Sequence, residues 1–153
     1  MPSLHILDYD PAHQPAFRAL NHEWITRFFV MEEPDYQMLD DPQRYILAPG
    51  GAIVMAQYDG QLVGTCALLR EHAGVFELAK MAVAPAAQGL GIGWALGQAA
   101  IVKARELGAR QLELLSNSRL TPALALYRKL GFRAVPVPPS PYQRTDVKMV
   151  LDL

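Results

Sequence analysis

The stretch FELAKMAVAPAAQGLGIG, residues 76–93, constrains the fold more than any other, because it joins an apolar strand to a glycine-rich turn and a helix. The strand part, residues 76–83, ends before Pro85, and an amphipathic run begins at Ile92. Glycine accepts backbone conformations that other residues avoid, and the first N–H groups of a helix have no partner inside the helix. A turn of this kind can hold an anion such as a phosphate group.

Two common phosphate motifs do not match these residues. A Walker loop ends in Gly-Lys-Ser/Thr, whereas Gly93 is followed by Trp94, and a dinucleotide fingerprint would need Gly or Ala in place of Leu96. The residues follow the pattern Q-x-x-G-x-G instead, with Gln88, Gly91 and Gly93 at its fixed positions. This segment resembles the acyl-CoA-binding segment of the GNAT superfamily of N-acetyltransferases.

Composition limits the classes of protein to consider. We expect one domain over residues 1–153, which is long enough to bury a sizeable core. The 14 Lys and Arg are spread along the chain against 15 acidic residues, so nothing indicates a nucleic-acid partner. The single Cys66 cannot form an internal disulfide, and no apolar run is long enough for a membrane span, which favours a cytoplasmic protein. The histidines show no metal-ligand spacing, so we expect no metal.

Hydrophobic periodicity and turn signals divide the chain into strands and helices. We expect strands at residues 4–7, 52–58, 61–69, 76–83, 111–115, from 132, and 147–153, with Asp59-Gly60 as a hairpin turn. We expect helices at residues 11–29 after an Asp10 cap, 35–47 with a break at Asp41-Pro42, 92–107, and from a Thr121 cap to Gly131. The third helix should bury Ile92, Ala95, Leu96, Ala99 and Val102. The βαβ connection should make strands 76–83 and 111–115 parallel.

This order of elements is that of the GNAT fold, so the resemblance covers nearly the whole chain. A second block, PALALYRKLGF at residues 122–132, resembles the A-x-x-L-Y-x-K-x-G-F helix of the family. The resemblance implies an α/β (α+β) fold with a mixed, mostly antiparallel sheet of about seven strands and about four helices on its faces. It also implies acetyl-CoA as co-substrate.

The resemblance assigns coenzyme-binding residues one by one. Free backbone groups of Met81, Ala82 and Val83 would hold the pantetheine arm. Asn117 and Tyr127 would lie near that arm and near the sulfur, respectively. The pyrophosphate would bind the turn residues Gln88, Gly89, Leu90, Gly91, Ile92 and Gly93.

Two residues are candidates for proton transfer. By resemblance, Tyr127 protonates the departing thiolate; the alternative is an aromatic core residue at helical spacing. Glu77 is a charged residue in an apolar strand where some family members carry a base, although an exposed strand carboxylate would look the same. In a regular strand Glu77 shares a face with Met81 while Lys80 points to the other, so we expect Glu77 and Lys80 not to pair. We expect Cys66 to be a buried apolar residue and no covalent acetyl carrier.

The sequence specifies the site for the acceptor amine less closely than the site for the coenzyme. The resemblance places the acceptor site between the first two helices and the link between the last two strands. Glu32 and Glu33 could attract a cationic amine and Arg144 could bind a carboxylate, although ordinary surface or packing roles explain each residue as well. The candidate acceptor residues are Trp24, Phe28, Glu32, Glu33, Tyr142 and Arg144.

Together these features predict an N-acetyltransferase that moves acetyl from acetyl-CoA directly to a primary amine of a small molecule, peptide or protein. The alternative is a non-catalytic acyl-CoA-binding or sensing module on the same fold, and a longer acyl group is a third option. The apolar last strand offers an edge for a possible homodimer. We expect neither a nucleic-acid nor a membrane partner.

Overall fold

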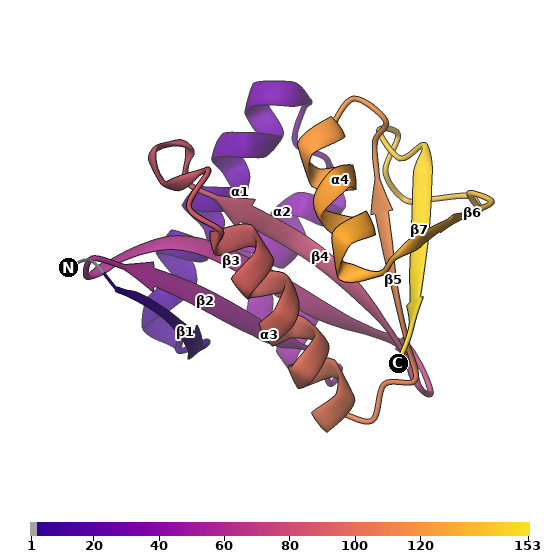
Figure 1. Ribbon diagram of the computed structural model, residues 1–153, viewed down its shortest axis with the longest axis horizontal. Helices are drawn as coiled ribbons and strands as arrows, with labels where there is room; N and C mark the ends of the chain where they lie inside the picture. Colours follow the sequence, from indigo (N-terminus) through magenta and orange to yellow (C-terminus); the bar gives the residue numbers. More distant parts are fainter. Residues whose placement is uncertain (1–2) are drawn as a thin grey trace.

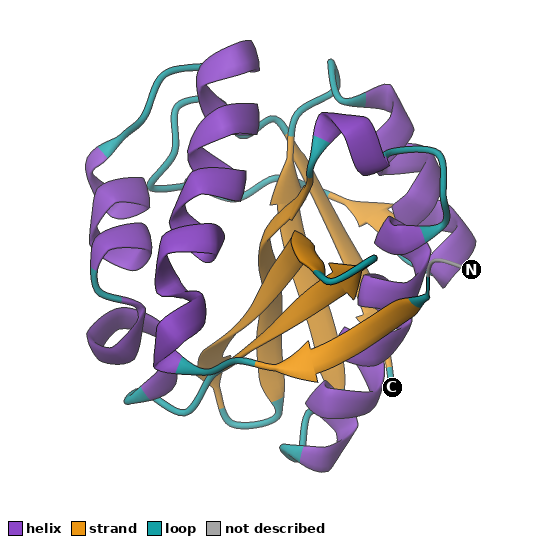
Figure 2. Ribbon diagram, turned by 90° about the vertical axis from the view of Figure 1, so that its left-hand side faces the viewer, coloured by secondary structure: helices purple, strands orange, loops and turns teal. Residues whose placement is uncertain are grey.

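The computed structural model describes residues 3–153, which form a seven-stranded sheet with helices on both faces (Figures 1 and 2). The strands lie side by side in the order β1-β2-β3-β4-β5-β7-β6. Every neighbouring pair is antiparallel except β4 and β5, which are parallel as predicted. This confirms the predicted fold class. The strands are β1 (Leu4–Asp8), β2 (Ala52–Tyr58), β3 (Gln61–His72), β4 (Val75–Val83), β5 (Gln111–Ser116), β6 (Arg133–Val135) and β7 (Val147–Asp152).

The helices divide between the two faces of the sheet (Figure 2). The first two pack on one face, and α3 and α4 pack on the other. None of the helices in residues 3–153 combines the length and the hydrophobicity that a membrane crossing requires. The helices are α1 (Gln14–Phe28), α2 (Glu33–Asp40), α3 (Ile92–Glu106) and α4 (Thr121–Leu130), with shorter turns at Pro11–His13, Gln43–Leu47 and Pro85–Ala87.

The central strands are buried on both faces, which explains their nearly continuous apolar sequence. In β2, Ile53 and Met55 pack beneath α1 and α2, whereas Val54 and Ala56 pack beneath α3. The sheet therefore separates two hydrophobic cores. The site described below lies where the strands between these cores move apart.

Two of the predicted turns and helix caps are confirmed, and one is wrong. Asp59 and Gly60 form the β2/β3 turn with φ of +52° and +77°, the left-handed values that this hairpin type requires. Asp10 caps the first helical turn by accepting from Ala12 N. Thr121, however, is the first residue of α4 rather than its cap. The amide of Leu124 donates to Leu120 O, so Leu120 is the N-cap and the helix begins one residue earlier than predicted.

The prediction that α3 buries Val102 is wrong, because this side chain is 53% exposed. The buried stripe is rotated toward α4, where Gly97 faces Leu130; a Cβ on Gly97 would lie 2.5 Å from Leu130 Cδ1. The close approach of α4 at this glycine covers one flank of α3 and leaves the Val102 flank open. The buried residues of α3 are Ile92, Leu96, Gly97, Ala100, Ile101 and Ala104.

Candidate active site

The parallel strands β4 and β5 separate halfway along their length (Figure 1). They pair only between residues 75–77 and 111–113, although β4 continues to Val83 and β5 to Ser116. Backbone groups that leave a ladder need other partners. The second half of β4 can therefore offer its backbone N–H and C=O groups to a bound molecule.

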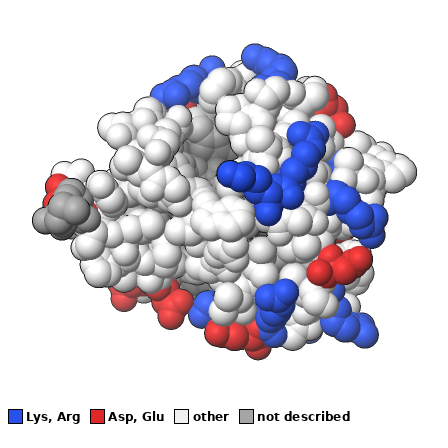
Figure 3. Space-filling model, viewed as in Figure 1, with Lys and Arg blue, Asp and Glu red and all other residues white. Residues whose placement is uncertain are grey.

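Two adjacent cavities lie at this opening. The first, of about 200 Å³, is lined by β4, β5, α4 and the segment before β7. The second, of about 450 Å³, lies over the glycine-rich turn, and both are lined by Met81, Val83, Gln88 and Tyr127. Figure 3 shows a hollow between this turn and α4, with Lys and Arg side chains gathered on its α4 side. Because residues of β4, the turn and α4 line both cavities, we infer that the two cavities form a channel from the turn to the interior of the strand opening.

The glycine-rich turn uses glycine for its backbone conformation. Gly89 and Gly91 have φ of +83° and +78°, and a Cβ at either position would meet no atom within 4 Å. Gly91 is the N-cap of α3 and has no side chain to accept from the first N–H groups of the helix, while Gln88 Nε2 donates to Val83 O over 3.3 Å. The first N–H groups of α3 are therefore left for an anion in the second cavity. Gly89, Gly91, Ile92 and Gly93 line this cavity, and Leu90 is exposed beside it.

Tyr127 of α4 lies where the two cavities meet. Its ring packs edge-on against Phe132 at 6.2 Å between centroids, and no residue among 3–153 takes or gives a hydrogen bond at its hydroxyl. Burial raises the pKa of Tyr127 to about 12, so the hydroxyl keeps its proton at neutral pH. It can donate this proton to a base formed in the channel.

A β-bulge in β4 changes the direction of Lys80. Ala79 and Ala82 pair with Ala67 and Thr65 of β3, so two residues of β4 lie opposite one of β3. Lys80 has φ of +52°, which is unusual for a residue with a side chain. The regular alternation of β4 is interrupted at this point.

The bulge places Lys80 on the same face of β4 as Glu77. Leu78 packs in the core beneath α3, so Glu77 faces the α1/α2 side, where Lys80 Nζ donates to Asp35 Oδ1 of α2 over 2.6 Å. The prediction that Lys80 points away from Glu77 is therefore wrong. The pattern of β4 could not show this, because only the bulge breaks its alternation.

Asp35 joins Lys80 to the segment before β7. Its side chain is fully buried and accepts from Arg144 Nη1 and Nη2 over 2.9 and 2.7 Å. Lys80 Nζ also donates to the Tyr142 hydroxyl over 3.0 Å. Burial alone would raise the pKa of Asp35, but the Arg144 hydrogen bonds and the Lys80 charge lower it to about 2. Sequence reasoning missed Asp35, although Lys80, a second charge inside an apolar strand, was a signal for such a partner.

The acceptor residues predicted from sequence lie in different places. Trp24, Tyr142 and Arg144 line the first cavity, and Phe28 lies at the edge of the second, 41% exposed. Asn117 also lines the first cavity and donates through Nδ2 to Arg144 O over 2.6 Å.

The two candidate carboxylates at the start of α2 do not reach this cavity. Glu32 lies outside it and accepts from Arg144 Nη1 and Gln143 N, both over 3.2 Å. Glu33 is exposed and lines neither cavity.

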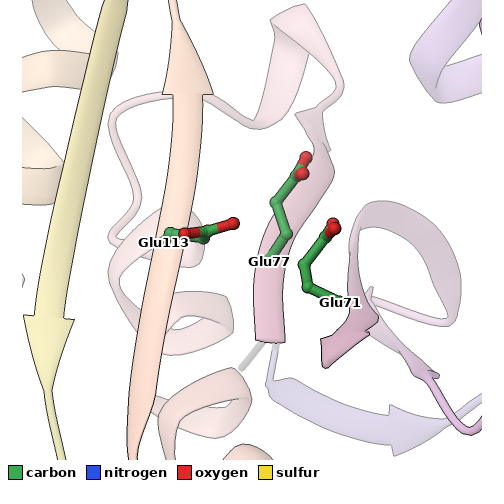
Figure 4. A group of neighbouring side chains, drawn as sticks. All are labelled: Glu71, Glu77 and Glu113. Atoms are coloured by element: carbon green, nitrogen blue, oxygen red, sulfur yellow. The ribbon is translucent and has the colours of Figure 1, made fainter. Parts of the chain in front are cut away.

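Glu77 lies in a group of three carboxyl groups from three adjacent strands (Figure 4). Oxygen atoms of Glu71, Glu77 and Glu113 all lie within 4.8 Å of one another, and Lys148 Nζ is 3.2 Å from Glu113 Oε2. Burial and the neighbouring Glu71 raise the pKa of Glu77 to about 8. Glu77 can therefore exchange a proton near neutral pH. The sequence did not reveal the group, because its members are distant in the chain.

Comparison with known proteins agrees with this geometry. A model of the acetyltransferase (GNAT) family matches residues 18–132. YjgM of Escherichia coli K12, an uncharacterized N-acetyltransferase, is 33% identical over 135 residues, which cover 84% of this chain and 79% of that protein.

Solved structures show the same fold. A GNAT-family acetyltransferase from Staphylococcus aureus Mu50 superposes with a TM-score of 0.87 at 19% identity, covering 98% of this chain and 99% of that one. YncA of Salmonella typhimurium, solved with its cofactor acetyl-CoA, has a TM-score of 0.77 at 19% identity, covering 98% and 94%. From its match to the family model and to YjgM, this chain belongs to the acetyltransferase (GNAT) family.

Proposed function

We propose that this acyltransferase moves an acetyl group from acetyl-CoA directly to a primary amine, with both substrates bound at once. The observation that carries the proposal is the channel that runs from the glycine-rich turn to the cavity lined by Glu77 and Tyr127. A coenzyme with a phosphate end and a thioester end needs such a path. The acetyl-CoA bound to the YncA structure supports the choice of coenzyme.

The turn and α4 would hold the phosphate end of the coenzyme. The start of α3, at Ile92 and Gly93, lines the second cavity. Lys and Arg side chains lie on the α4 side of the hollow in Figure 3, and the last turn of α4 carries Arg128 and Lys129. A helix start and cationic side chains both favour an anion. The pantetheine arm would then follow residues 81–83 through the strand opening.

Glu77 and Tyr127 would carry the two proton transfers. Glu77 accepts a proton from the ammonium group of the acceptor, directly or through water, and the amine attacks the thioester carbonyl. The N–C bond forms, the C–S bond breaks, and Tyr127 gives its proton to the thiolate. The second proton of the attacking nitrogen then passes, directly or through water, to the tyrosinate, which restores Tyr127 and leaves a neutral amide. A backbone N–H beside the bulge, at Met81, would stabilise negative charge on the carbonyl oxygen. Burial raises the pKa of the Cys66 thiol to about 12, which argues against a covalent acetyl-cysteine.

The rival function is non-catalytic acyl-CoA binding on the same fold. The Tyr127 hydroxyl lies between the two cavities and has no hydrogen-bond partner among residues 3–153. This favours catalysis, because binding alone requires no acid at the sulfur.

The first test is thermal unfolding and calorimetry with acetyl-CoA, CoA and NAD in parallel, followed by thiol release with a panel of amines. We expect the CoA ligands, and not NAD, to raise the melting temperature. Binding without thiol release for any amine would favour the rival, and no response to either CoA ligand would overturn both.

A further inference from the structure

We propose that the acceptor is a small amino acid, whose carboxylate binds Lys80, Tyr142 and Arg144 while its amine faces Glu77. This inference rests on the proposed function and names the class of its second substrate.

The charged side chains that face the first cavity favour an anionic group. Lys80, Arg144 and Glu77 line it, whereas Asp35, which pairs with both cations, is 0% exposed and lies behind them. Glu32 meets Arg144 from the outer side, and Glu33 faces solvent. The cavity wall therefore offers two cations, and the carboxylates expected to attract a cationic amine do not line it.

Three residues that line this wall keep a hydrogen-bond donor that has no acceptor among residues 3–153. An ammonium group has three donors, and Lys80 uses one on Asp35 and one on the Tyr142 hydroxyl. The Tyr142 oxygen accepts from Lys80, so its own proton is left to donate. Among residues 3–153, nothing accepts from this hydroxyl or from Arg144 Nε. A carboxylate has the acceptor capacity for all three donors.

The buried position of Lys80 makes an added anion favourable. Burial lowers the pKa of Lys80, with Asp35 opposing this effect, because charge is poorly solvated there. Burial and nearby carboxylates raise the pKa of Tyr142, so its hydroxyl remains a donor. A substrate carboxylate would stabilise the ammonium and accept from the hydroxyl.

The bulge brings the site for the carboxylate next to the site for the amine. Without it, Lys80 would face the α3 side of the sheet, opposite Glu77. With it, the ammonium and the Glu77 carboxyl lie on one wall and influence each other electrostatically. An acceptor whose amine and carboxylate are attached to the same carbon matches this arrangement.

The size of the cavity also favours a small acceptor. About 200 Å³ is below the roughly 300–1,000 Å³ of sites for drug-sized ligands, and the thioester must share this space. Trp24 and Phe29 line the remaining wall. An amino acid with an apolar side chain therefore fits better than an aminoglycoside or a long polyamine.

The test compares amino acids with the amines that they become when the carboxylate is removed. The pairs are leucine with 3-methylbutylamine, methionine with 3-(methylthio)propylamine, and phenylalanine with phenethylamine. Thiol release gives kcat/KM for each, and calorimetry in the presence of CoA gives binding. We expect at least one amino acid to exceed its amine by roughly tenfold to a hundredfold, which is the effect of one or two hydrogen bonds to a charged group.

Lys80→Met and Lys80→Arg then test the assignment within the enzyme. We expect Lys80→Met to lower the ratio of kcat/KM for the amino acid to kcat/KM for its amine by about tenfold, because Tyr142 and Arg144 still bind the carboxylate, and Lys80→Arg to lower it less. The ratio is measured within each variant, so loss of active protein does not affect it. If Lys80→Met does not fold, Tyr142→Phe replaces it, with a smaller reduction of the ratio expected.

The outcomes separate this inference from the proposed function. If the amines react with the wild-type protein as well as the corresponding amino acids do, this inference is overturned and the proposed function is not. Acceptance of only polyamines or aminoglycosides would do the same. If acetyl-CoA neither binds nor is consumed with any amine, the proposed function fails together with it.

Discussion

Lys80 and Glu77 face the same side of β4, although a spacing of three residues would put them on opposite sides of a regular strand. The bulge at Lys80, with φ of +52°, causes the change of side. Such a backbone costs on the order of 1–3 kcal/mol and persists where its surroundings hold it. Here the buried Asp35 holds the Lys80 ammonium, so a candidate base and a cation share one wall of the cavity.

Replacement of Tyr127 by Phe should lower turnover and leave acetyl-CoA affinity nearly unchanged. The hydroxyl supplies the proton for the thiolate, and such transfers contribute roughly 10²–10⁴-fold. Steady-state thiol release and calorimetry would measure the two effects. Tyr45→Phe, in the turn after α2, lies outside both cavities and serves as the control. Unchanged turnover of Tyr127→Phe would remove the residue from the mechanism.

The wild-type rate should rise as pH increases through about 8, because Glu77 acts as a base only when it is deprotonated. Glu77→Gln should remove this rise and lower the rate at high pH by roughly 10²–10⁴-fold. The measurement is kcat/KM against pH with a saturating coenzyme.

The acceptor amine also titrates at alkaline pH, so a second variant is needed to identify Glu77 as the source. Glu71→Gln removes a neighbour that raises the pKa of Glu77, and should therefore move the rise to lower pH. A Glu77→Gln profile identical to that of the wild type would contradict the assignment.

The free energy of unfolding should depend on Asp35 at acid pH. Its pKa is about 2 in the folded state against an ordinary 3.8, so its contribution is present above 3.8 and lost as pH falls toward 2. Ionised Asp35 therefore contributes about 2 kcal/mol to the free energy of unfolding at neutral pH. Urea unfolding at a series of pH values would show this loss in the wild-type protein and not in Asp35→Asn.

Asp35→Asn should also destabilise the protein at neutral pH by about 3–5 kcal/mol, because Lys80 and Arg144 lose their buried counterion. Asp40→Asn is the matched control, since Asp40 pairs with Arg18 at the surface and should contribute little. Equal midpoints for the two variants would show that the buried pairing does not stabilise the fold.

Gly91 and Gly108 allow conformational strain to be separated from coenzyme binding. Both have positive φ and open space at the Cβ position, but Gly91 begins α3 at the second cavity and Gly108 follows its end. Alanine should destabilise the fold similarly at both, by about 1–2 kcal/mol. Only Gly91→Ala should weaken acetyl-CoA binding, and Gly91→Asp should abolish it. Calorimetry that finds equal affinities for both alanine variants would count against the turn as the phosphate site.

Most of the architecture could be predicted from sequence because its signals are local. The Asp59-Gly60 turn, the cap at Asp10 and the glycine after β4 each depend on a few neighbouring residues. The hairpins and the βαβ connection predicted the β2-β3-β4 meander and the parallel β4/β5 pair. The prediction that the last strand offers an edge is wrong, because β7 lies between β5 and β6. The buried face of α3 was predicted less well, since Val102 is uncovered by the way α4 packs at Gly97.

The sequence by itself determined the strand, turn and helix of residues 76–93, the order of the elements, and the two blocks that indicate an acyl-CoA enzyme. Only the tertiary structure decided which charges meet. Arg144 and Asp35 are 109 residues apart in the chain, and the three carboxyl groups around Glu77 come from three strands. Local pattern cannot specify such pairings, because they depend on how distant segments pack and on one bulge that turns Lys80 toward α2.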